Sequence, residues 1–97
     1  MRLVVFVAPF PMLATMKFAR ALSSIGDVIL LGVFQNTPNR PDVFDLELSV
    51  HNVFDVSQLS LILQQIHNRF GRIHRLVGIL EQLQEPLALL RERFSIE

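Results

Sequence analysis

The run LVVFVA at residues 3–8 decides the fold that this sequence predicts. All of its residues are apolar and none alternates with a polar one, so both faces of a strand formed here need burial. Such a strand is typical of the centre of a parallel sheet. Pro9 and Pro11 end the run, and Pro11 suits the first turn of a helix because an N–H would have no partner there. We therefore expect a central strand that leads into a helix.

The spacing of apolar residues predicts two amphipathic helices beyond this strand. In the first, apolar side chains recur at helical intervals from Ala14 to Ile25, which predicts about four turns that end at Gly26. The second helix is expected over residues 55–71. Its first aspartate and a glutamine three positions later form a capping pair, and a glycine closes it.

Three further segments are predicted to form strands. Residues 28–34 and 73–80 are mostly apolar, which again predicts buried strands. Apolar and polar residues alternate over residues 44–50, which favours a half-exposed strand at the sheet edge. The pairing segment here could instead run over residues 49–54. Residues 36–42, with two prolines and two asparagines, form the clearest loop.

Pro86 is expected to open a last helix, whose apolar face carries Leu87, Leu90 and Phe94. The elements then follow in the order β-α-β-β-α-β-α. The predicted class is α/β, a three-layer Rossmann-like domain with a mostly parallel four-stranded sheet and helices on both faces. We expect residues 1–97 to form a single domain.

The composition excludes several classes of function. The formal net charge is +0, so the chain lacks the basic excess that nucleic-acid binding requires. There is no cysteine, which excludes disulfides and thiolate metal sites, and no apolar run approaches the ~18 residues of a membrane span. We therefore expect a cytoplasmic domain without nucleic-acid or membrane partners. The hydrophobic fraction of 51% suggests that part of the surface is covered by a partner.

Ligands of open α/β sheets bind beyond the carboxyl ends of the strands. Pro9 and Phe10 follow the first strand, Gln35 follows the second, and Glu81 and Gln82 follow the fourth. We predict these five as substrate-contacting residues. The alternative for Glu81 is a residue that only caps amides at the start of the last helix.

No catalytic or metal constellation accompanies these residues. The first strand–helix turn has prolines where dinucleotide binding needs glycines. The histidines have no partner at metal-ligand spacing and read as surface or core residues; they are His51, His67 and His74. A cluster of acidic residues could form a metal site but reads better as a solvated sheet edge; it comprises Asp42, Asp45, Glu47 and Asp55. We predict no catalytic residue, no metal site and no resident cofactor.

Residues 74–96 resemble the end of the N-terminal domain of ATP-grasp carboxylate ligases. In that family the fourth strand ends in a Glu, here Glu81, and a helix of pattern P-x-A-x-x-R-E-x-x-x-I follows, here from Pro86 to Ile96. The opening strand with its helix and the helix over residues 55–71 are similar to this pre-ATP-grasp domain as well. The resemblance covers nearly the whole chain.

The resemblance implies a substrate-side domain in a larger enzyme that ligates a carboxylate to an amine or thiol through an acyl phosphate. ATP and Mg²⁺ would be bound by a catalytic part that these 97 residues do not contain, so the chain alone would be inactive. The positions that match the family's substrate side are Pro9, Phe10, Glu81 and Gln82. The two prolines depart from the glycine-containing turn of several members, which argues against a phosphate-bearing substrate there.

Two other classes of function remain open. The chain could be a standalone Rossmann-like interaction or regulatory module, or half of a two-domain glycosyltransferase. The expected partners are the remaining domains of a parent enzyme or a second copy of the chain in a dimer. The apolar surface for this contact is expected at Phe10, Met12 and Phe94.

Overall fold

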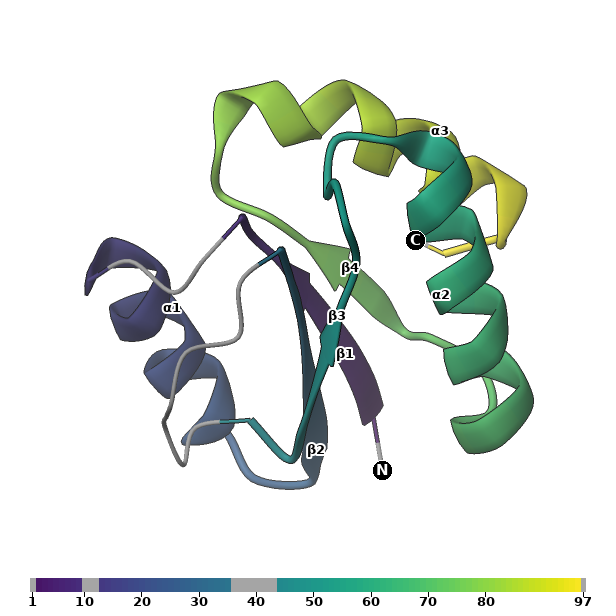
Figure 1. Cartoon of the computed structure of the whole chain (residues 1–97). Coiled ribbons are helices and arrows are strands. Elements are labelled where there is room, and N and C mark those ends of the chain that lie inside the picture. Colours follow the sequence, from purple (N-terminus) through teal and green to yellow (C-terminus); the bar gives the residue numbers. More distant parts are fainter. Residues whose placement is uncertain (1, 10–12, 36–43, 97) are drawn as a thin grey trace.

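The computed structural model describes residues 2–9, 13–35 and 44–96, with no account of the side chains of residues 13–15. Its elements, in chain order, are β1 (Arg2–Val7), α1 (Leu13–Ser23), β2 (Val28–Phe34), β3 (Leu46–Ser49), α2 (Val56–Phe70), β4 (Arg75–Val77), the 3₁₀ turn η1 (Glu81–Leu83) and α3 (Gln84–Arg93). Figure 1 shows their arrangement.

The four strands form one sheet in the order β3-β2-β1-β4, and every neighbouring pair is parallel. This confirms the predicted α/β class and places β1 inside the sheet, with β2 on one side and β4 on the other. The chain adds β2 and β3 outward from β1 and then crosses back to add β4 on the opposite side. The strand order therefore reverses between β1 and β4, which is the topological switch point of a doubly wound sheet.

Helices cover both faces of the sheet, with α1 on one face and α2 and α3 on the other (Figure 1). Alternate residues of the β1 segment supply the two cores. The side chains that face α2 and α3 are Leu3, Val5 and Val7, and those that face α1 are Val4, Phe6 and Ala8. Burial of both faces explains why the LVVFVA run is apolar without alternation.

An aromatic side chain from the β2–β3 connection adds to the cover over the α1 face. The Phe44 ring lies 5.3 Å from that of Phe34 and 6.2 Å from that of Phe6, measured between centroids. Gly32 leaves the room for this packing, because a Cβ there would come within 2.6 Å of the Phe34 ring.

The two ends of α2 are as the sequence predicts. The Asp55 side chain accepts hydrogen bonds from the backbone N–H groups of Ser57 (2.9 Å) and Gln58 (3.4 Å), and so caps the first turn. At the other end Gly71 has a φ of 95° and donates its N–H to the carbonyl of His67 at 2.9 Å. A positive φ of this kind is accessible to glycine at little cost.

Several predicted boundaries were wrong. β4 spans Arg75–Val77 rather than residues 73–80, because the chain turns away from the sheet after Val77. The third strand is Leu46–Ser49, at the sheet edge as expected, and the alternative over residues 49–54 is wrong. α1 has 11 residues, about three turns, and Pro11 lies outside the described residues.

The last helix also starts earlier than predicted. It begins at Gln84, after η1, so Pro86 is its third residue. A proline is tolerated there because the first-turn N–H groups of a helix have no intrahelical partner. Within the described part of the chain, no helix is long and apolar enough to cross a membrane.

Candidate functional site

The turn after β1 and the end of β2 lie together at the carboxyl end of the sheet. Pro9 is buried, and its carbonyl accepts the backbone N–H of Gln35 at 2.8 Å. The side-chain oxygen of Gln35 accepts the backbone N–H of Val53 at 3.0 Å. Gln35 therefore ties three segments together, and its amide oxygen already has a structural partner. Phe10, also predicted here, lies outside the described residues.

Glu81 and Gln82 lie in η1 and are both exposed. The sequence predicted that they follow the strand directly. In the structure the short segment 78–80 separates them from β4. This segment carries the chain across the carboxyl end of β4. It leaves the two polar side chains on the surface beyond the strand, where the substrate side of the sheet was predicted.

Leucine side chains fill the switch point between β1 and β4. A Cβ on Gly78 would lie 2.8 Å from Leu87 Cδ1, 3.1 Å from the carbonyl oxygen of Val7 and 3.2 Å from Leu83 Cδ1. Leu83 and Leu87 are both fully buried. Gly78 is therefore a point of close approach between the chain after β4, β1 and α3, and hydrocarbon occupies the place where Rossmann ligands commonly bind.

Polar side chains from α3 and its first turn fix this closed end. Gln84 donates its side-chain amide to the carbonyls of Gly78 (2.7 Å) and Leu80 (2.9 Å). Arg91 donates from Nε and Nη2 to the carbonyl of Leu76 at 3.0 and 2.6 Å. β4 is the last strand of the sheet on this side, and the Arg91 fork occupies one of its backbone acceptors.

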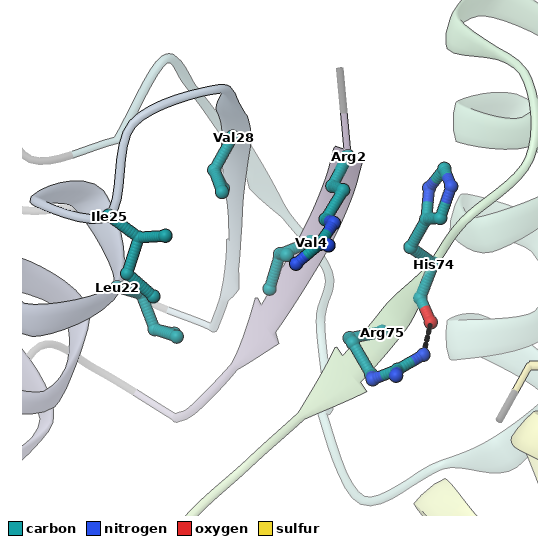
Figure 2. Close-up of a pocket in the computed structure, with 7 residues that line it drawn as sticks. All are labelled: Arg2, Val4, Leu22, Ile25, Val28, His74 and Arg75. Carbon is teal, nitrogen blue, oxygen red and sulfur yellow. Dashed lines mark hydrogen bonds between the residues drawn. The ribbon is translucent and has the colours of Figure 1, made fainter.

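A cavity of about 390 Å³ lies at the opposite, amino end of the sheet, on the α1 face. It is lined by Arg2, Val4, Leu22, Ile25, Val28, His74 and Arg75 (Figure 2). No local pattern in the sequence indicates this cavity. The only hint in the sequence is a basic residue at the start of each of two strands, Arg2 of β1 and Arg75 of β4. They line the same cavity because β1 pairs with β4.

Hydrogen bonds fix the β1–β4 side of this cavity. The backbone N–H of Leu3 donates to Nδ1 of His74 at 3.2 Å, and the N–H of His74 donates to the carbonyl of Leu3 at 2.8 Å. The Nδ1 contact requires that this nitrogen carry no proton. Nη1 of Arg75 donates to the carbonyl of His74 at 2.8 Å (Figure 2).

Among the described residues, no group of three or more His, Asp or Glu side chains could hold a metal ion. The three histidines are all exposed, and His74 is held by its hydrogen bond to β1. No model of a known protein family matches this chain, and no curated protein sequence matches it either.

Proposed function

We propose that this chain is the N-terminal, substrate-side domain of an ATP-grasp ligase-like enzyme and is inactive alone. The main support for the proposal comes from the segment after β4. It combines the sequence pattern of residues 74–96 with two exposed polar side chains, Glu81 and Gln82, at the carboxyl end of a sheet with switch-point topology. The close packing of Gly78 against β1 and against Leu83 and Leu87 holds the start of this segment in place, which supports the proposal.

The chemistry available at this surface is recognition rather than catalysis. The carboxylate of Glu81 can accept hydrogen bonds from an ammonium or hydroxyl group, and the Gln82 amide can both donate and accept. Because both side chains are exposed, a partner surface is needed to exclude water and strengthen these contacts. In the proposed parent enzyme, the ATP- and Mg²⁺-binding part would supply that surface.

The turn that carries Glu81 is held in place by Leu83, Leu87 and Gln84. The two leucines pack the turn onto β1, and the Gln84 amide ties it to the end of β4. A turn held in this way presents Glu81 in a defined direction, which is what a specific substrate contact requires. The domain would thus act as a rigid wall of a composite cleft.

The test is an activity assay on the product of the reading frame that continues past Glu97. We expect an ATP-dependent ligase that releases ADP with a suitable carboxylate and amine or thiol. Glu81→Gln should lower kcat/KM by about tenfold or more through the loss of a charged hydrogen bond. Glu92→Gln, at an exposed position in the last turn of α3, is the matched control.

Two results would overturn the proposal. One is a reading frame without an ATP-dependent ligase part. The other is an active ligase in which Glu81→Gln and Glu92→Gln behave alike. The 97-residue chain itself should show no thermal shift with Mg-ATP, and a clear shift would place a nucleotide site within these residues.

The second candidate is an interaction module without chemistry that associates with its own copy. Large apolar side chains that remain exposed favour it; the most exposed are Leu61 (68%), Ile25 (63%) and Leu89 (51%). Phe94, predicted as part of this surface, is instead half-buried against the α2–α3 core, and Phe10 and Met12 lie outside the described residues. Light scattering after size exclusion tests this candidate, since a monomer at high concentration would reject it.

A further inference from the structure

The outer edge of β4 points away from the described sheet, in which β4 is the last strand and pairs with β1. The N–H of Ala8 donates to the carbonyl of Val33 in β2. Successive backbone groups of a strand point to opposite edges, so those of Val5, three residues earlier, face β4. Val5 lies opposite Leu76, and in a parallel pair such a residue bonds to the two neighbours of its partner. The N–H and carbonyl of Leu76 therefore point outward.

Outward backbone groups on an edge strand are a template for pairing with another strand. At Leu76 a side chain of the same chain occupies the acceptor. Arg91 of α3 donates from Nε and Nη2 to the Leu76 carbonyl, at 3.0 and 2.6 Å. A carbonyl oxygen has two lone pairs, and this guanidinium fork uses both of them. The Leu76 carbonyl is thereby closed to the N–H of a further strand.

The carbonyls two residues before and after Leu76 are covered in a similar way. Nη1 of Arg75 donates to the carbonyl of His74 at 2.8 Å. The side-chain amide of Gln84 donates to the carbonyl of Gly78 at 2.7 Å. Three alternate carbonyls along this part of the chain thus accept side-chain donors, and the one that Arg91 covers lies in the middle.

The middle position decides whether β4 can pair with β4 of a second copy. Two identical strands that pair antiparallel are related by a two-fold axis, and each presents the same edge to the other. With this axis at Leu76, the two Leu76 residues lie directly opposite and exchange both N–H···O bonds. That exchange needs the carbonyl that Arg91 occupies. The guanidinium groups of the two copies would also meet near the axis, where their like charges repel.

We propose that Arg91 keeps the outer edge of β4 closed, and that without Arg91 this edge pairs with the same edge of a second copy. The half-buried Val77 and the 38% exposed Ile79 are close to Leu76 in the chain, and a second strand would cover them further. The contact between α3 and β4 is therefore autoinhibitory, because it hides a surface on which the chain would associate with itself.

The experiment compares the self-association of Arg91→Met and Arg93→Met by light scattering over a concentration series. Arg93 is the matched control, because it belongs to the same helix and carries the same charge but is exposed and reaches Ser60 only at 3.4 Å. The dimer dissociation constant of Arg91→Met should be at least about tenfold lower than that of Arg93→Met. Equal dissociation constants in the folded variants would overturn the proposal.

Amide hydrogen exchange followed by NMR locates the contact. The exchange of the Leu76 N–H should slow as the concentration of Arg91→Met rises, and should not depend on concentration in Arg93→Met. Association that shifts the methyl groups of Leu61 and Leu89 and leaves the exchange of Leu76 unchanged would refute pairing through β4.

A second variant, Arg91→Lys, keeps the charge but loses the guanidinium fork. It should strengthen self-association by a smaller factor than Arg91→Met. If Arg91→Met does not fold, Arg91→Lys decides the question, and a dissociation constant equal to that of Arg93→Met would then count against the proposal.

Discussion

The two ends of the sheet are built in opposite ways. At the carboxyl end, Leu83 and Leu87 pack against Gly78 and close the switch point between β1 and β4. At the amino end, a cavity of about 390 Å³ remains between α1 and the starts of the same two strands. Leucine side chains of the chain itself thus fill the carboxyl end of the sheet, where ligands of Rossmann-like sheets usually bind. The cavity lies at the amino end instead.

The difference has a simple physical origin in where the helices lie. η1 and α3 follow β4 after the short segment 78–80, and they place Leu83 of η1 and Leu87 of α3 against Gly78. On the other face, α1 and Phe44 pack over β1 and β2, and the cavity lies beside the start of β4. The strand order alone therefore does not predict at which end of the sheet a cavity is found.

Leu87→Ala should have the largest effect on stability, because Leu87 is fully buried at the closed end. We expect a loss of about 2–5 kcal/mol in the free energy of unfolding, from lost burial and the cavity left behind. Urea unfolding followed by far-ultraviolet circular dichroism measures it. Leu89→Ala, on the same helix but 51% exposed, should cost less than about 1 kcal/mol. Equal losses would mean that the carboxyl end is not packed as described.

Gly78→Ala should come next, because its Cβ would meet Leu87 Cδ1 at 2.8 Å and the Val7 carbonyl oxygen at 3.1 Å. The side chain can shift but the backbone of β1 cannot easily do so, and overpacking typically costs about 1–3 kcal/mol. The same urea titration measures the change. A loss below about 0.5 kcal/mol would show that the close approach relaxes freely.

Arg91→Met should remove both hydrogen bonds to the Leu76 carbonyl while keeping an apolar stem. We expect a loss of about 1–2 kcal/mol, since Arg91 is half-buried and the acceptor would be left without this donor. Arg93→Met is the control, because Arg93 is exposed and reaches Ser60 only at 3.4 Å. If both variants unfold at the same urea concentration, the Arg91 fork contributes nothing to β4.

Ile25→Ser, at the open amino end, should have the smallest effect. Its side chain is mostly exposed, so the free energy of unfolding should change by less than about 0.5 kcal/mol. Thermal unfolding of the variant beside the unmodified chain is a sufficient measurement. A loss comparable to that of Gly78→Ala would mean that the cavity wall is part of the core.

The fold was predictable because the strongest signals are local. The LVVFVA run, the capping Asp55 and the closing Gly71 each define an element without knowledge of the rest of the chain. The end of β4 was not predictable in this way. Residues 78–80 look like a continuation of an apolar strand, and only the approach of α3 to Gly78 shows why the chain leaves the sheet there.

The candidate surface was partly predictable and the cavity was not. Pro9 and Gln35 each follow a strand of the parallel sheet and lie side by side, but no pattern in the sequence indicates that the Gln35 side-chain oxygen accepts a hydrogen bond from the N–H of Val53. Arg2 and Arg75 are far apart in sequence, and their meeting depends on β4 joining β1 rather than β3. No local pattern carries that information.

The contrast between the two ends is tested most directly by paramagnetic relaxation of methyl groups with a soluble gadolinium chelate. The methyl groups of Leu22 and Val28 line the open cavity, and those of Leu83 and Leu87 are fully buried. We expect the methyl groups of Leu22 and Val28 to relax several-fold faster than those of Leu83 and Leu87. Similar relaxation at both pairs, or faster relaxation at Leu83 and Leu87, would contradict it.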